Sequence, residues 1–213
     1  MKTTIYLVRH GEVENPEKLI YGRLPRFILS ERGRSQVGKL AKYFRAIKLD
    51  AVYASPLLRS RQTAKCILTY QPKLKIHYSK KLLEIDNKIW EGIVWTKRDP
   101  KLVKKYRDTP AKIKTNGLES AIDLAKRMSE KINQIIKKHK GGKIAIFSHA
   151  DSIRAATLHY ESKNLDQLHE RICTNASITT LVFNGGKLIK SSYKEIHPRA
   201  EESFWTKTKK ELA

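Results

Sequence analysis

Three short polar clusters hold residues that could do chemistry. Arg9-His10-Gly11-Glu12, Ser55-Pro56-Leu57-Leu58-Arg59 and Ser148-His149-Ala150-Asp151 each follow a short apolar run. An imidazole is a capable nucleophile toward phosphorus, and guanidinium groups bind phosphate oxygens through paired N–H donors that lysine lacks. If the clusters share one pocket, its two histidines and two arginines favour a phosphate group as the ligand.

Strands and helices in alternation must position these clusters. Runs rich in Ile, Val and Tyr predict strands at Thr3–Val8, Ala51–Ala54 and Lys143–Phe147, and a helical pattern follows each of them. This alternation predicts an α/β fold, a single three-layer domain over residues 1–213 with a mostly parallel central sheet and helices on both faces. Ligands of open α/β sheets bind outside the carboxyl ends of the strands, so the three clusters should converge there.

The helix pattern is strongest over Ser120–His139, where apolar residues recur three or four positions apart. Ser120 stands where its side chain would cap this helix. Further helices are expected from near Ser30 and after Pro56, and Asp151 is expected to cap a fourth helix.

The C-terminal part of the chain predicts a β-hairpin. Ile178–Phe183 and Leu188–Ile196 read as two strands, and Asn184-Gly185-Gly186 separates them. Asn and Gly are the residues that tight hairpin turns favour, because they accept positive φ angles. We expect this hairpin to close the fold.

Four motifs extend over nearly the whole chain. They are Leu7-Val8-Arg9-His10-Gly11-Glu12, then Ser55-Pro56-Leu57-Leu58-Arg59-Ser60-Arg61-Gln62-Thr63-Ala64, then Leu83-Glu84-Ile85-Asp86 with Trp90-Glu91-Gly92, and last Ser148-His149. As a set, and in this order, they resemble the histidine phosphatase superfamily, also called phosphoglycerate mutase-like. The resemblance implies that family's α/β fold and a phosphatase that hydrolyses phosphomonoesters of small molecules without a metal or other cofactor.

The resemblance also implies catalytic roles for named residues. His10 takes the position of the nucleophile, which attacks phosphorus in line and carries a phosphohistidine intermediate. Arg9, Arg59 and His149 take the positions that bind the transferring phosphoryl group, where the charge on its oxygens must be balanced.

A carboxyl group is also needed as the proton donor. The family pattern gives Glu84 this role, with a proton passed to the leaving group and another later taken from water. Nothing in the local sequence distinguishes Glu84 from Glu91, so either carboxylate could face the pocket. The donor needs a raised pKa, which apolar surroundings or a nearby anion would supply.

Two further residues are candidates for substrate binding. Family members often carry an Asn six positions after the nucleophile, whereas here Asn15 lies five positions after His10 and Pro16 takes the sixth. Arg23 lies in the loop before the helix that starts near Ser30. It could bind substrate, and it could equally be a solvated basic residue.

Mutase-type phosphoryl transfer is the alternative activity. Cofactor-dependent phosphoglycerate mutases carry Arg-His-Tyr-Gly directly after the acid, whereas this chain has Ile85-Asp86-Asn87-Lys88. The sequence therefore favours hydrolysis. The shared motifs do not select a particular phosphomonoester, whose contacts are expected in variable loops such as Lys97–Asn116.

The charge of the chain invites a different class of function. The 213 residues include 44 Lys and Arg against 21 Asp and Glu, which gives a formal net charge of +23. Because 40% of the residues are hydrophobic, the chain is not a disordered basic tail. A nucleic-acid-binding protein with a secondary phosphatase core is therefore a second, less favoured hypothesis, because no recognised nucleic-acid module is present. A third hypothesis is that the basic surface steers small anionic substrates into a basic cleft.

Cysteine usage and hydropathy indicate the compartment. Cys66 and Cys173 lie far apart and form no Cys/His cluster, so neither a disulfide framework nor a zinc site is predicted. No apolar run reaches the length of a signal peptide or a membrane span. We therefore expect a cytoplasmic protein with no membrane contact.

Overall fold

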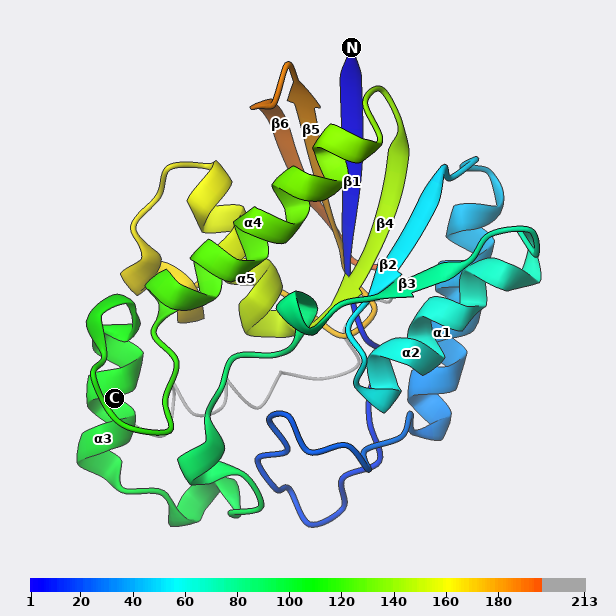
Figure 1. Ribbon diagram of the computed structural model, residues 1–213. Coiled ribbons are helices and arrows are strands. Elements are labelled where there is room, and N and C mark those ends of the chain that lie inside the picture. The colour runs from blue at the N-terminus through cyan, green and yellow to red at the C-terminus, as the bar shows by residue number, and fades with distance from the viewer. Residues whose placement is uncertain (197–213) are drawn as a thin grey trace.

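A central sheet of six strands organises residues 1–196, the part of the chain that the computed structural model describes (Figure 1). The strands are β1 (Lys2–Arg9), β2 (Ala51–Ala54), β3 (Ile76–Tyr78), β4 (Lys143–Ser148), β5 (Ile178–Asn184) and β6 (Lys187–Lys194). Their order is β3-β2-β4-β1-β5-β6. The first four strands run parallel, β5 pairs antiparallel with β1, and β6 pairs antiparallel with β5. The mostly parallel sheet that the sequence predicts is confirmed, and the predicted hairpin forms its antiparallel edge.

Helices cover both faces of this sheet (Figure 1). The α-helices are α1 (Glu31–Arg45), α2 (Leu58–Ala64), α3 (Pro100–Asp108), α4 (Ala121–Lys138) and α5 (Ala150–Tyr160), with 3-10 helices at Lys65–Thr69, Lys80–Leu82, Lys88–Trp90, Trp95–Lys97, Pro110–Lys112 and Leu165–His169. Residues of α4 and α5 share one apolar core, and residues of α1 and of Lys65–Thr69 share a second core with the opposite face. The three-layer α/β arrangement is therefore confirmed.

The alternation of side chains along β1 separates the two cores. Ile5 and Leu7 pack with α4 and α5, whereas Tyr6 and Val8 pack with α1. All four side chains are buried, which is expected of a strand covered by helices on both faces. The short apolar run at the start of the chain therefore becomes a central strand.

The helix starts follow the sequence at two positions and differ at a third. Ser30 and Ser120 accept hydrogen bonds from the backbone three residues on, as N-caps do. The expected cap at Asp151 is wrong, because the N-cap of α5 is His149, whose extended backbone continues β4. Asp151 lies in the first turn instead, and its carboxylate pairs with Arg154 at 2.8 Å.

Two strand details also differ from the sequence prediction. The edge strand β3 was not predicted, since three residues are too few to show a period, and it forms by parallel pairing with β2. The hairpin turn is as expected, with Gly185 and Gly186 at φ +57° and +84°. These angles lie in the left-handed region that glycine adopts without steric cost.

Two long segments pass beyond the carboxyl ends of the parallel strands (Figure 1). The first joins β1 to α1, and the second runs from β3 through α3 to α4. Together they surround the strand ends at which the polar clusters lie. Across residues 1–196, no helix is both long and apolar enough to cross a membrane.

Candidate active site

His10 and His149 meet at the carboxyl edge of the sheet. They follow the paired strands β1 and β4, in which Arg9 is the register partner of Ser148. Their ring centroids lie 5.2 Å apart. Arg59, on α2 after β2, places its Nε 3.2 Å from Nε2 of His10. The structure therefore brings together residues from all three polar clusters, and their side chains are buried.

The imidazole of His10 is held in one orientation. Its Nδ1 lies 2.7 Å from the carbonyl oxygen of Gly11, and a carbonyl can only accept, so Nδ1 carries the ring proton. Nε2 is then left with a lone pair, which accepts from Arg59. Burial lowers the pKa of His10 well below 6.5, and the charges of Arg59 and Arg9 lower it further. His10 is thus a neutral imidazole whose free nitrogen points at a guanidinium group.

Each of the two arginines is tied to the backbone by one nitrogen. Arg9 Nη1 donates to the carbonyl oxygen of Cys173, and Arg59 Nη2 donates to that of Gly22, both at 2.6 Å. In contrast, Arg9 Nε and Arg59 Nη1 are buried without a partner in the described structure, and so is Nδ1 of His149. Because buried polar atoms are nearly always paired, three such atoms from neighbouring residues fit a ligand with several oxygen acceptors.

The other ring nitrogen of His149 is bound to a serine. His149 Nε2 lies 2.8 Å from Oγ of Ser55, a residue of the second cluster to which the sequence assigns no role. Burial lowers the pKa of His149 well below 6.5, with further contributions from Arg59 and His10. His149 is therefore a second neutral imidazole, and Ser55 orients it.

Glu84, in the segment after Lys80–Leu82, packs its carboxyl group against the first turn of α5, which follows His149. Its Oε1 accepts from the backbone nitrogen of Ile85 at 2.9 Å, and from the nitrogen and the hydroxyl of Ser152, both at 3.3 Å. Burial raises the pKa of Glu84, and the negative charge of Asp151 raises it further. The carboxyl group therefore keeps a proton at pH values at which an exposed glutamate has lost it.

Glu91, the competing carboxylate, is engaged elsewhere. It accepts a hydrogen bond from the backbone nitrogen of Arg23 and so supports the loop Tyr21–Arg23. That loop covers Arg59, whose guanidinium carbon lies 4.7 Å from the ring centre of Tyr21. Glu91 thus stabilises the loop over the arginine, whereas the Glu84 carboxyl group lies against the first turn of α5, which follows His149.

The two weaker candidates make their hydrogen bonds within the protein. Asn15 binds both backbone groups of Leu19, at 2.9 and 3.0 Å, and so closes its own loop. Arg23 donates to the carbonyl oxygen of Glu84 and to the carboxylates of Asp86 and Glu119. In the described residues, neither side chain forms a hydrogen bond with the histidines or with Arg59.

Sequence reasoning missed two residues that surround Glu84. Glu119 and Arg127 pair through Nε of the arginine at 2.6 Å, and both are largely buried. Arg127 lies mostly off the apolar stripe of its helix, so the sequence pattern predicts a solvent-exposed side chain like those of the neighbouring lysines. In a chain of net charge +23, no local signal marks one arginine as buried. Among residues 1–196, the His, Cys, Asp and Glu side chains form no group of three that could hold a metal ion.

Comparisons with known proteins identify the family of this chain. The sequence profile of the histidine phosphatase superfamily (branch 1) matches residues 5–195. The uncharacterized protein Rv0525 of Mycobacterium tuberculosis is 31% identical over 204 residues, which cover 91% of this chain and 96% of that protein. Phosphoserine phosphatase 1 of Hydrogenobacter thermophilus is 29% identical over 181 residues, which cover 83% of this chain and 85% of that protein.

Solved structures show the same fold. The structure of YhfR from Bacillus stearothermophilus superposes with a TM-score of 0.81 at 26% identity, over 88% of this chain and 94% of that one. The family match extends from the first strand to the end of the hairpin, and so includes every polar cluster of the site. The chain therefore belongs to the histidine phosphatase superfamily and is a phosphatase.

Proposed function

We propose that this phosphatase hydrolyses small phosphomonoesters through a phosphohistidine formed on Nε2 of His10, without a metal ion. The observation that carries the proposal is the bond from Nδ1 of His10 to Gly11, which leaves Nε2 without a proton, so that its lone pair accepts from Arg59 until substrate binds. A neutral imidazole with a lowered pKa is the reactive form of this nucleophile.

The chemistry has two displacements at phosphorus. In the first, Nε2 of His10 bonds to phosphorus, the ester P–O bond breaks, and Glu84 gives its proton to the leaving oxygen. In the second, water attacks the phosphohistidine, the N–P bond breaks, and the Glu84 carboxylate takes a proton from that water. Inorganic phosphate leaves, and both residues return to their starting forms.

Protein groups balance the charge of the phosphoryl oxygens in this proposal. Arg9 Nε and Arg59 Nη1 are unpaired donors, and Nδ1 of His149 joins them when Ser55 donates its hydroxyl proton to Nε2. Donors aimed at the charge that develops in the transition state are each worth about 10² or more in rate. Arg9, Arg59 and His149 therefore bind the substrate and stabilise the transition state.

The substrate class is a small phosphorylated metabolite, and phosphoserine is the first compound to test. The support comes from the relatives, since one carries the name phosphoserine phosphatase 1 and a second that of metal-independent phosphoserine phosphatase, from Arabidopsis thaliana at 28% identity. The second name also fits a reaction in which protein side chains, rather than a metal, supply the positive charge.

The test is release of inorganic phosphate from a panel that includes phosphoserine, 3-phosphoglycerate and p-nitrophenyl phosphate, with EDTA present. We expect turnover that His10→Ala abolishes and that His77→Ala, a change at an exposed histidine of β3, leaves intact. Quenching a turnover mixture with alkaline detergent should recover a phosphoenzyme that is stable in base and loses its phosphate in acid. Turnover that survives in His10→Ala, or that requires added metal, would overturn the proposal. Conversion of 3-phosphoglycerate to its isomer without phosphate release would favour the mutase instead.

A further inference from the structure

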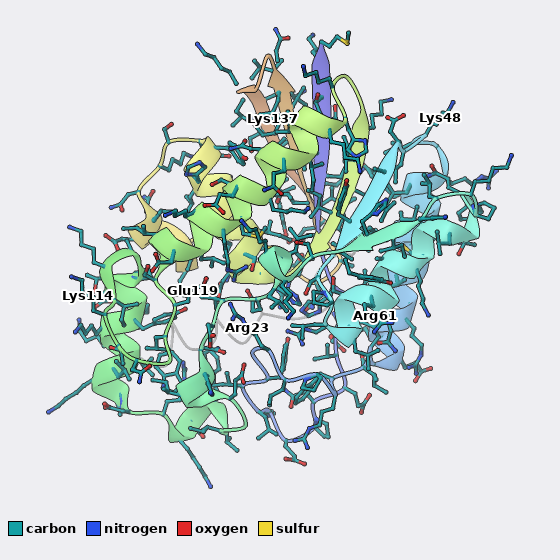
Figure 2. All side chains as sticks on the ribbon, viewed as in Figure 1. Arg23, Lys48, Arg61, Lys114, Glu119 and Lys137 are labelled. Atoms are coloured by element: carbon teal, nitrogen blue, oxygen red, sulfur yellow. The ribbon has the colours of Figure 1, made fainter. Side chains whose placement is uncertain are left out.

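Three charged side chains from distant parts of the chain meet around the segment that carries Glu84. Arg23 comes from the loop after β1, Glu119 from the residue before the N-cap of α4, and Arg127 from the second turn of α4. Figure 2 shows Arg23 and Glu119 pointing into the same region, between the α3 segment and the sheet. We call these three residues the Glu84 clasp.

Arg127 holds the backbone that leads to Glu84. Its Nη1 donates to the carbonyl oxygens of Lys81 and Leu83, at 2.9 and 2.8 Å. Its Nη2 donates to the carbonyl oxygen of Glu84 at 2.9 Å and to Glu119 at the same distance. One guanidinium group therefore binds three carbonyls of a segment that belongs to no strand.

Arg23 binds the same carbonyl from the other side. Its Nε donates to the carbonyl oxygen of Glu84 at 2.8 Å, and its two Nη atoms reach Asp86 and Glu119 at 2.9 and 3.0 Å. The carbonyl of Glu84 thus accepts from two arginines. No ladder hydrogen bond is available at this position, so these arginines fix where the Glu84 side chain begins.

Glu119 connects the two arginines. Its carboxylate accepts from both guanidinium groups and from the backbone nitrogen of Asp86 at 2.9 Å. Its own backbone nitrogen donates to the carbonyl oxygen of Asp86 at 2.7 Å. The side chain is 13% exposed, and hydrogen bonds between charged groups in such surroundings are strong and directional.

We infer that Arg23, Glu119 and Arg127 are positioning residues that hold the Glu84 carboxyl group at the leaving oxygen of the substrate. The inference rests on the proposed function, in which Glu84 is the proton donor. In the described residues the clasp side chains form no hydrogen bond with Arg9 or Arg59, and all three contact the segment that carries Glu84. Arg23 also follows Gly22, whose carbonyl oxygen anchors Arg59, so Glu119 rather than Arg23 is the first residue to change. Without Glu119, the two guanidinium groups repel one another and the Glu84 carbonyl loses its fixed partners.

Misplacement of a proton donor has a kinetic signature that general destabilisation lacks. A serine alkoxide is a strongly basic leaving group and needs the proton, whereas p-nitrophenolate leaves readily without one. A correctly placed general acid contributes about 10² to 10⁴ in rate. Loss of the clasp should therefore slow an alkyl phosphate far more than it slows the release of p-nitrophenolate.

The experiment compares Glu119→Gln with Glu130→Gln. Glu130, on α4, forms an ion pair with Lys81 of the segment that leads to Glu84, but both side chains of this pair are exposed. We would measure kcat on phosphoserine, or on the best alkyl phosphate of the panel, and the pre-steady-state burst of p-nitrophenolate. The burst reports the first displacement alone. Glu119→Gln should lower kcat on the alkyl phosphate about 10²-fold, and it should lower the burst rate less than about tenfold. Glu130→Gln should change neither the kcat nor the burst rate.

Glu84→Gln separates failure of the inference from failure of the proposed function. If Glu84→Gln slows both substrates equally, the proton donor itself has been misassigned. If Glu84→Gln is selective but Glu119→Gln slows both substrates equally or slows neither, the clasp does not position the acid. Should Glu119→Gln fail to fold, Arg23→Gln keeps the Glu119–Arg127 pair and should show the same selectivity with a smaller loss. A change in KM alone in Arg23→Gln would indicate substrate binding and overturn the inference for that residue.

Discussion

Arg59 Nε lies 3.2 Å from Nε2 of His10, so the guanidinium group occupies the lone pair that the proposed reaction uses. The same side chain is anchored by Nη2 on Gly22 and keeps Nη1 unpaired. In the proposed reaction, Arg59 therefore both orients His10 and offers a donor to the phosphate group. A phosphate group that binds between them replaces the bond to His10 with bonds to its own oxygens.

The first prediction follows from these three nitrogens. Arg59→Lys should lower kcat/KM by about 10² or more, because a lysine ammonium cannot bind Gly22, His10 and phosphate at once. Arg61→Lys on the same helix is the control, since Arg61 is exposed and stacks on Tyr78 (Figure 2). Steady-state kinetics on one phosphomonoester would test this prediction. An active Arg59→Lys variant would refute the proposal that Arg59 both orients His10 and binds the phosphate.

The second prediction concerns the pH dependence of kcat/KM, which reports the pKa values of the free enzyme. With ordinary values, His10 would be neutral only above pH 6.5 and Glu84 protonated only below pH 4.5, so the two reactive forms would hardly coexist. Burial lowers the pKa of His10 and raises the pKa of Glu84, which brings the two active ranges together. The acidic limb of the profile should therefore lie below pH 6.5, and the basic limb above pH 4.5.

Asp151 provides the check on that assignment. Burial alone would raise the pKa of Asp151, but Arg154 and His169 lower it overall, so Asp151 is an anion beside Glu84. Asp151→Asn removes this charge, so it should lower the pKa of Glu84 and move the basic limb to lower pH. Asp108→Asn, at an exposed position, should leave the profile in place. A basic limb that stays fixed in Asp151→Asn would show that another group controls it.

The third prediction uses two glycines of α1. A Cβ on Gly33 would collide with the backbone of Glu12, two residues after His10, whereas a Cβ on Gly38 would meet nothing within 4 Å. Gly33→Ala should therefore destabilise the fold by about 1 to 3 kcal/mol, the usual cost of overpacking. Gly38→Ala should stabilise it by about 0.5 to 1 kcal/mol, because alanine is the better helix former. Equilibrium denaturation measures both changes, and equal effects would contradict the packing at Glu12.

The fourth prediction concerns the net charge of +23. If basic surface residues such as Lys48, Lys114 and Lys137 (Figure 2) steer anionic substrates, kcat/KM should fall at least about tenfold as salt rises from about 0.01 M to about 1 M. The value of kcat should change little, because steering acts before the complex forms. A flat kcat/KM would exclude steering. Salt-sensitive RNA binding that persists in His10→Ala would support the nucleic-acid hypothesis instead.

Much of the fold could be predicted because its signals are local. The apolar runs of β1, β2 and β4, the serine caps of α1 and α4, and the glycine turn of the hairpin each depend on residues close in sequence. Strand β3 and the first turn of α5 were not predicted correctly. The former depends on pairing with β2, and the latter on where β4 ends.

Local patterns in the chain were enough to show that His10, Arg59 and His149 each follow a strand of one parallel sheet, and parallel strands end at one edge. The folded arrangement was needed to show which nitrogen of His10 carries no proton, that burial and Asp151 raise the pKa of Glu84, and that Glu91 supports a loop. It also decided which three of the many charged residues hold the acid segment. The physical reason is that burial and charge pairing depend on residues distant in sequence, whereas strand and helix patterns depend on near neighbours.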